Sequence, residues 1–187
     1  MRKKMIKSVC FTGHRPSKLN FKCNEESSQF KAFDRTLRQQ IVDLCYNGYR
    51  RFYTGMAEGV DLWAAEIVVG LLDSFYNLQL YAVIPYPGQR NTMREEIRCR
   101  YDHVLKFSKK VIYTSKEYTP DCFKLRNCYM IDHCEKVIAV YDPEQWRSGT
   151  GQAVRYAQKK ERDILLSIPT HLRILHKKST RPSCAFP

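Results

Sequence analysis

Short apolar runs alternate with longer amphipathic segments along almost the whole chain, and this alternation most constrains its fold. The short runs are typical of buried strands, and the longer segments carry apolar residues at helical spacing. Parallel strands need crossover connections, which helices usually supply. We therefore predict an α/β, doubly wound, mostly parallel sheet of about six strands with helices on both faces. Strands are expected at residues 7–12, 51–54, 78–84, 111–114, 137–141 and 164–168, and helices at 27–46, 60–72, 92–107, 122–134 and 151–160.

Length and composition fit one globular domain. The chain has 187 residues, of which 43% are hydrophobic, and this suffices for a single hydrophobic core. We predict one domain over residues 1–170 and a basic, loosely ordered tail over residues 171–187. No apolar run reaches the roughly 18 residues of a membrane span. The basic start is not followed by the apolar stretch of a secretory signal. A cytoplasmic protein without membrane partners is therefore expected.

Cysteine spacing and the distribution of charge narrow the expected partners. None of the eight cysteines forms a C-x-x-C pair, which favours reduced thiols and no metal site. The net charge of +13 suggests nucleic-acid binding, but much of the excess lies in the two ends of the chain. Charge on such ends predicts weak, salt-sensitive attraction to nucleic acid rather than a shaped groove.

Residues suited to ligand binding follow several of the predicted strands. In doubly wound sheets, ligands bind beyond the carboxyl ends of the strands, near the switch in strand order. Glycines, hydroxyls, arginines and carboxylates gather at these positions here, so we predict that this edge of the sheet binds a ligand. The candidates identified in this way are Gly13, His14, Arg15, Gly55, Glu58, Gly59, Asp61, Arg90, Asn91, Ser148, Gly149 and Thr150.

The loop from Gly55 to Gly59 joins a strand to an apolar helix and carries the most informative pattern. Glycine permits positive φ and close approach of a ligand to the backbone, and the free amides at a helix start suit a phosphate. Glu58 is placed to accept hydrogen bonds from a ribose, whereas Asp61 either joins it or caps the helix. Residues 148–151 repeat this arrangement, because their amides and hydroxyls either bind phosphate or cap the next helix.

Arginine and histidine side chains supply the remaining candidates. Arg15 and Arg90 each follow a strand, and a guanidinium binds phosphate or carboxylate through two parallel hydrogen bonds. On sequence alone, His14 is an acid, a base, a stacking group or a structural residue. The chain has neither a G-x-G-x-x-G run nor a Walker A loop, so the ordinary dinucleotide pattern is missing.

Four separated motifs resemble one known family. They are T-G-H-R-P at 12–16, Y-T-G-M-A-E-G-V-D-L-W-A-A-E at 53–66, R-N-C-Y-M-I-D at 126–132, and Y-D followed by S-G-T within 141–150. In this order they resemble the YpsA-type branch of the SLOG superfamily over about residues 5–168. The resemblance implies a Rossmann-like fold and the binding or sensing of a nucleotide or nucleotide-derived ligand, such as ADP-ribose or a related NAD metabolite. It also adds Arg126 and Asn127 to the candidate ligand-binding residues, and it implies self-association, which is frequent in the superfamily.

Two other branches of the superfamily suggest alternative functions. DprA proteins, which bind single-stranded DNA, carry runs similar to 54–61, Arg126-Asn127 and 148–150, although Cys128 stands here in place of a second arginine. LOG-type phosphoribohydrolases carry a catalytic glutamate where this chain has Ala153. A nucleotide N-glycosidase would therefore need Glu58 or Asp61 as its catalytic carboxylate. Nucleotide-ligand binding is the first hypothesis, N-glycosidase activity and single-stranded DNA binding are the alternatives, and whether the chain is an enzyme stays open.

Overall fold

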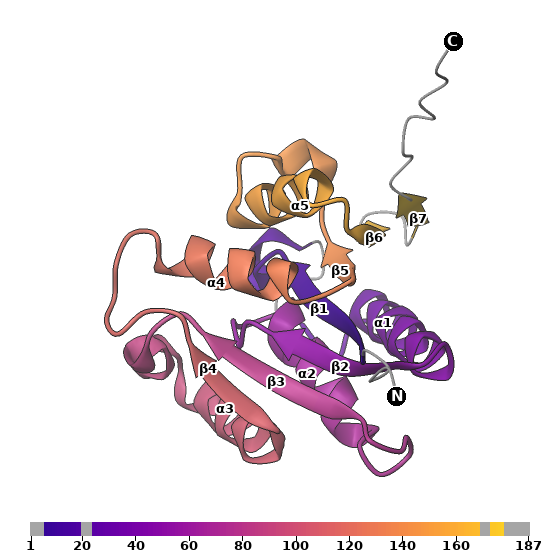
Figure 1. Cartoon of the computed structure of the whole chain (residues 1–187), viewed down its shortest axis with the longest axis horizontal. Coiled ribbons are helices and arrows are strands. Elements are labelled where there is room, and N and C mark those ends of the chain that lie inside the picture. Colours follow the sequence, from indigo (N-terminus) through magenta and orange to yellow (C-terminus); the bar gives the residue numbers. More distant parts are fainter. Residues whose placement is uncertain (1–5, 20–23, 169–172, 178–187) are drawn as a thin grey trace, which may run out of the picture.

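The computed structural model describes residues 6–19, 24–168 and 173–177 (Figure 1). Its strands form one 7-stranded sheet in the order β4-β3-β2-β1-β5-β6-β7. All neighbouring strands are parallel except β7, which runs antiparallel to β6. This confirms the predicted mostly parallel, doubly wound α/β fold. The strands are β1 (Lys7–Gly13), β2 (Tyr49–Thr54), β3 (Gln79–Ile84), β4 (Lys110–Tyr113), β5 (Lys136–Val140), β6 (Asp163–Ile168) and β7 (Arg173–Lys177).

Helices cover both faces of the sheet, with α1, α2 and α3 on one face and α4 and α5 on the other (Figure 1). Successive strand residues point to opposite faces, so Phe52 packs under α1–α3 and its neighbour Tyr53 under α4 and α5. The sheet is therefore covered by two apolar cores, as its apolar strands require. The helices are α1 (Ser28–Tyr46), α2 (Val60–Gly70), α3 (Glu95–Phe107), α4 (Cys122–Asp132) and α5 (Gly149–Lys159).

Local chemistry explains where the first helices begin and end. The Ser27 hydroxyl accepts a hydrogen bond from the Phe30 N–H at 3.1 Å and so caps α1. Gly48, with φ of 85°, follows this helix and lets the chain turn into β2. Helix α2 lies between α1 and α3 and buries nearly all of its side chains, which accounts for its apolar character on every side.

The structure differs from the sequence prediction at two places. Helix α3 begins at Glu95 rather than residue 92, because Pro87–Thr92 forms a separate 3-10 helix and Arg94 is extended. The segment 171–187, predicted to be a loosely ordered tail, contains β7, and the domain division at residue 170 stays a prediction. Without β7, the edge of β6 would expose unpaired backbone N–H and C=O groups. Strand β7 pairs with these groups through its own backbone, so the basic side chains of this segment do not prevent the pairing. Residues 1–5, 20–23, 169–172 and 178–187, which hold most of the basic ends, lie outside the described residues.

The described residues also bear on the expectations for cysteines, membrane spans and metal sites. Cys10, Cys45, Cys99, Cys122, Cys128 and Cys134 are free thiols. Within residues 6–19, 24–168 and 173–177, no helix is long and apolar enough to cross a membrane. The same ranges contain no cluster of three or more side chains suited to hold a metal ion.

Strand order reverses between β1 and β5, which lie side by side although three strands of the sheet's other half, β2, β3 and β4, separate them in sequence. From β1 the chain proceeds outward through β2, β3 and β4, and it then returns to β5 on the other side. The loops that leave β1 and β5 consequently diverge at their carboxyl ends. This is the switch point at which sheets of this kind open a ligand crevice.

Candidate functional site

A cavity of about 250 Å³ opens at the carboxyl edge of the sheet, where β1 and β5 meet. Its walls come from the loops after β1 and β2, from α4, and from the first turn of α5. These segments are far apart in sequence, and the switch in strand order brings them together. The lining residues are Thr12, Gly13, His14, Arg15, Lys18, Ala57, Glu58, Asp61, Phe123, Arg126, Asn127, Ser148, Gly149 and Thr150.

A buried ion pair forms the floor of this cavity. From α4, Arg126 Nη1 donates to Asp61 Oδ2 of α2 at 3.0 Å and also to the carbonyl oxygen of Gly55. The two side chains are only 7% and 8% exposed. Burial raises the pKa of Asp61 and lowers the pKa of Arg126, while the attraction between the two charges opposes both changes. Loss of either partner would leave an uncompensated buried charge, which typically costs about 3–5 kcal/mol.

Gly55 and Gly59 make room for protein atoms rather than for a ligand. A Cβ at position 55 would lie 1.5 Å from Arg126 Nη1 and 2.5 Å from Asp61 Oδ2. Gly59 has φ of 98°, and a Cβ there would lie 2.7 Å from the Cδ of Pro16. Neither glycine lines the cavity. This loop was predicted to bind a phosphate through its glycines. In the structure Gly55 leaves space for the Arg126–Asp61 ion pair, and Gly59 leaves space for Pro16 after β1.

His14 and Asp61 take structural positions within the cavity wall. Gly59 is the N-cap of α2 and Asp61 is ion-paired, so the aspartate does not serve as the N-cap residue. His14 is 1% exposed, and its Nε2 accepts a hydrogen bond from the Asp142 N–H at 3.1 Å. Its own backbone N–H donates to the carbonyl oxygen of Val140 at 3.1 Å. Burial lowers the pKa of His14, so the ring is neutral at pH 7 and ties the end of β1 to the end of β5.

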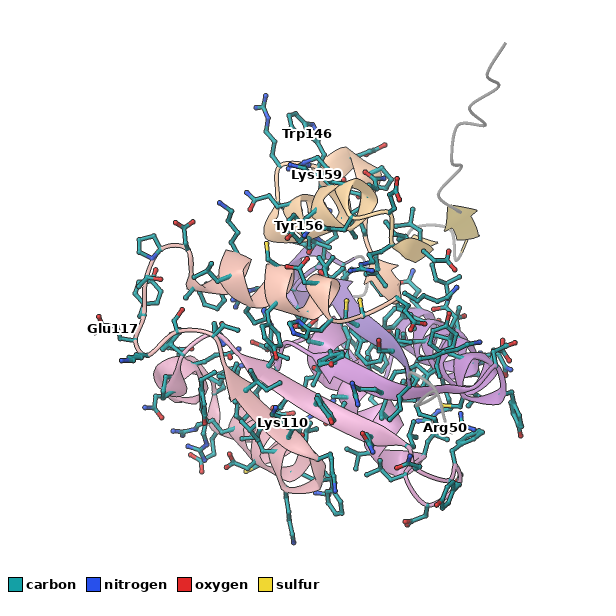
Figure 2. All side chains as sticks on the ribbon, viewed as in Figure 1. Arg50, Lys110, Glu117, Trp146, Tyr156 and Lys159 are labelled. Atoms are coloured by element: carbon teal, nitrogen blue, oxygen red, sulfur yellow. The ribbon has the colours of Figure 1, made fainter. Side chains whose placement is uncertain are left out.

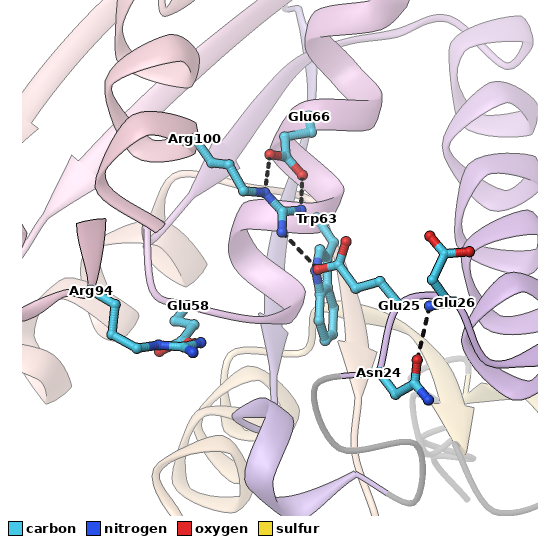
Figure 3. A network of polar contacts seen from close by, with 8 residues as sticks. All are labelled: Asn24, Glu25, Glu26, Glu58, Trp63, Glu66, Arg94 and Arg100. Atoms are coloured by element: carbon cyan, nitrogen blue, oxygen red, sulfur yellow. Dashed lines mark hydrogen bonds and ion pairs between the residues drawn. The ribbon is translucent and has the colours of Figure 1, made fainter. Parts of the chain in front are cut away.

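Glu58 stands at the rim of the cavity and is ion-paired to Arg94, with Oε1 3.0 Å from Nη2 (Figure 3). Beside it, Figure 3 shows Arg100 of α3 held by Glu66 of α2 and by Glu25, which its Nη1 contacts at 2.7 Å. The indole N–H of Trp63 also donates to Glu25, at 2.7 Å. This network fixes α2, α3 and the segment before α1 to one another.

The first turn of α5 offers unused hydrogen-bond donors. The Ser148 hydroxyl accepts from the Gly151 N–H at 3.1 Å, so Ser148 is the N-cap of this helix. The backbone N–H groups of Gly149 and Thr150 have no acceptor among the described residues. Gly149 is exposed at the cavity, and no atom would crowd a Cβ there within 4 Å. A helix start with free amides and a favourable dipole is suited to an anion.

Arg15 and Lys18 give the mouth of the cavity its positive charge. Both are exposed, and neither makes an ion pair with another described residue. The charge of Arg15 lies close enough to the floor to lower the pKa of both Asp61 and Arg126. Because Asp61 and Glu58 already have cationic partners, the lining carries a surplus of unpaired positive charge. Lys18 was not among the residues predicted from the sequence. Its only signal there is that it is a basic residue two positions after the T-G-H-R-P run.

Arg90 and Asn91 lie away from the cavity. They belong to the 3-10 helix after β3, two strands from the switch point, and neither lines the cavity. Both ends of the Arg90 guanidinium contact Asp102 of α3. The structure therefore brings together Gly13, His14, Arg15, Glu58, Asp61, Arg126, Asn127 and residues 148–150, but it does not bring Arg90 and Asn91 to the same place.

Fold and cavity together define a Rossmann-like α/β protein with a cavity at its switch point and unpaired cations at the mouth. The YspA SLOG family model matches residues 9–170, and the chain belongs to this family. UPF0398 proteins of Bacillus thuringiensis (strain Al Hakam) and Bacillus cereus (strain Q1) are each 27% identical over 161 residues, which cover 85% of this chain and 86% of theirs.

Solved structures with the same fold have low sequence identity. TM1055, a structural-genomics target, matches with a TM-score of 0.54 and 12% identity, over 85% of this chain and 72% of its own. DNA processing protein A from Helicobacter pylori, described for its single-stranded DNA binding mode, matches with a TM-score of 0.56 and 17% identity. That match covers 86% of this chain and 64% of the other. These likenesses concern the fold.

Proposed function

We propose that the cavity binds a phosphorylated, nucleotide-derived ligand. The observation that carries the proposal is the convergence of unpaired Arg15 and Lys18 with the free amides of Gly149 and Thr150 at one switch point. These groups donate hydrogen bonds and carry positive charge, so the ligand group that they recognise is an anion. The predicted nucleotide-ligand function agrees with this chemistry.

The proposed binding geometry assigns separate tasks to the lining residues. The ligand phosphate lies at the first turn of α5, where the Gly149 and Thr150 amides and the Arg15 guanidinium reach it. Glu58, at the rim, accepts hydrogen bonds from ribose hydroxyls. The Arg126–Asp61 pair provides a rigid, neutral floor.

Titration calorimetry with ADP-ribose and AMP tests this proposal. Arg15 is exposed, so Arg15→Gln leaves the fold intact and should weaken binding about tenfold, which corresponds to about 1.4 kcal/mol. The matched control is Arg90→Gln, which removes the same charge outside the cavity and should leave the affinity unchanged. Equal effects of the two variants, or the absence of binding by the unaltered protein, would contradict the proposal.

The N-glycosidase alternative receives less support from the geometry. Both candidate carboxylates are ion-paired, Asp61 to Arg126 and Glu58 to Arg94. Position 153, where LOG-type enzymes carry their glutamate, is a buried alanine on α5. No described carboxylate of the cavity is thus free of a cationic partner.

Single-stranded nucleic-acid binding is the second candidate, because one aromatic side chain is suited to stack on a base. Trp146 is 51% exposed, with the Arg147 guanidinium 4.7 Å and the Arg155 guanidinium 5.7 Å from its ring centroid. Stacking of one base on such a ring contributes roughly 1–3 kcal/mol. Fluorescence anisotropy with labelled oligothymidine should show binding that weakens with salt and falls at least fivefold in Trp146→Ala. Unchanged affinity in that variant would remove this candidate.

A further inference from the structure

Among the spaces that share a lining residue with the cavity, two differ sharply in charge. One lies beyond Glu58, measures about 290 Å³, and is lined by Glu25, Glu26, Glu96 and the ion-paired Arg94 and Arg100. The other lies beyond Asn127 and is a groove of about 440 Å³ between α4 and α5. A ligand too large for the cavity can extend into a neighbouring space of suitable charge.

The space beyond Glu58 is unsuited to an anionic extension. Its carboxylates outnumber its cations, and the Arg100 guanidinium is already bound by Glu25 and by Glu66 of α2 (Figure 3). The Trp63 N–H is likewise satisfied by Glu25. A further phosphate placed there would meet net negative charge without a free donor from Arg100.

The groove between α4 and α5 has the opposite character. Its floor includes Ile131 and Ala153, which are 1% and 3% exposed and offer an apolar surface. Its rim carries three cations, namely Lys124, Arg155 and Lys159, against the single carboxylate of Asp121. Figure 2 labels Trp146, Tyr156 and Lys159 at this end of the molecule, on or beside α5.

The rim lysines remain available to a ligand. Lys124 Nζ lies 3.9 Å from Asp121 Oδ1, at the outer limit of an ion pair, and its side chain is 66% exposed. Lys159 is exposed and has no ion-pair partner among the described residues. Such exposed pairs contribute little to stability, so a ligand phosphate competes easily for these ammonium groups.

Asn127 connects the groove to the cavity, because it lines both. Its side chain makes no hydrogen bond with another described residue, so its amide is free to contact a ligand that passes from one space to the other. The cavity alone, at about 250 Å³, is smaller than the roughly 300–1,000 Å³ of most ligand sites. Together with the groove, the connected space falls within that range.

We propose that the α4–α5 groove is the second half of the binding site and holds a second anionic part of the ligand. The ligand class is then a nucleotide derivative longer than a phosphorylated sugar, such as a nucleoside diphosphate ester, rather than a mononucleotide that the cavity alone would take. The inference rests on the proposed function, because it requires the first phosphate to lie at the start of α5.

Charge removal in the groove tests the inference directly. We would compare Lys124→Gln/Lys159→Gln with Lys106→Gln/Lys109→Gln, which removes two exposed lysines far from the groove. The groove variant should weaken ADP-ribose binding about tenfold and leave ribose 5-phosphate binding within twofold of its original value. The control variant should change neither affinity. Equal ADP-ribose affinity in the two variants would overturn the inference.

Cys128 gives an independent readout, because its half-buried thiol lines the groove. Saturating ADP-ribose should slow its alkylation by N-ethylmaleimide, followed by peptide mass spectrometry, whereas ribose 5-phosphate should not. The exposed Cys99 of α3 is the internal control and should react at the same rate throughout. Unprotected Cys128 at saturating ADP-ribose would overturn the inference, and so would protection that depends only on protein concentration, since a second copy would then fill the groove.

The two proposals fail in different ways. If neither probe binds the unaltered protein, the proposed function falls and this inference falls with it. If ADP-ribose binds and Arg15→Gln weakens it, while the groove variant has no effect, only the inference about the groove is wrong.

Discussion

Replacing Gly55 by alanine should destabilise the protein through a residue more than seventy positions away. The new Cβ would lie 1.5 Å from Arg126 Nη1 and 2.5 Å from Asp61 Oδ2, where no atom fits. The Arg126 side chain must therefore withdraw from its site, and Asp61, which is 6% exposed, loses its counterion.

The expected magnitude follows from the cost of opening a buried ion pair, which is about 3–5 kcal/mol. For a chain of this size each kcal/mol lowers Tm by roughly 2–4 °C, so the fall should be about 6–20 °C. Urea denaturation and circular dichroism melts measure both quantities. Gly70→Ala is the matched control, because no atom lies within 4 Å of a Cβ there and alanine is the better helix former.

The double mutant Gly55→Ala/Arg126→Ala tests whether Arg126 is the side chain that the new Cβ displaces. In the Arg126→Ala background the guanidinium is gone and only the Asp61 carboxylate, with Oδ2 2.5 Å from the new Cβ, has to turn aside, so Gly55→Ala should then cost less than about 1 kcal/mol. A cost that is the same in both backgrounds would refute the explanation. So would a single Gly55→Ala variant within about 1 kcal/mol of the unaltered protein.

Two further predictions concern the same edge of the sheet. Gly151→Ala should destabilise by about 1–3 kcal/mol in urea titrations, because its Cβ would lie 2.2 Å from the Trp146 carbonyl oxygen, whereas Gly149→Ala should be neutral within about 0.5 kcal/mol. Below pH 6.5, the ordinary pKa of histidine, stability should fall as the pH falls, because the unfolded chain protonates His14 while the buried ring, with its lowered pKa, resists protonation. His14→Gln should flatten this part of the pH profile, and an unchanged slope would contradict the assignment.

Local patterns in the sequence were enough to predict the architecture. The apolar runs that became β1, β2, β3 and β5 are short and bounded by glycine or proline, and the amphipathic spacing of α1 is long and regular. The edge strand β7 was not predicted, because it pairs with β6 through backbone groups. Its basic segment shows no alternation of apolar and polar residues that would indicate a strand. The start of α3 was misplaced because Pro87 nucleates a separate turn first.

The sequence predicted where the candidate site lies better than it predicted which atoms each of its residues contacts. Glycine after a strand predicts a close approach, yet the sequence does not say whether a ligand or Arg126 makes that approach at Gly55. The pairing of Arg90 with Asp102 depends on how α3 packs against the turn before it, which is a tertiary contact. Residues that follow the strands nearest the switch point line one cavity, because topology alone brings those ends together.

The ion pair beneath the cavity also bears on the order in which the protein can fold during its synthesis. Arg126 lies 65 residues after Asp61 and 71 after Gly55, and the two ends of this link belong to helices on opposite faces of the sheet. A chain synthesised only as far as β4 lacks α4, and it therefore lacks Arg126, the counterion of Asp61. The floor of the cavity therefore stays incomplete until α4 has been synthesised, and the earlier half on its own is an incomplete folding unit.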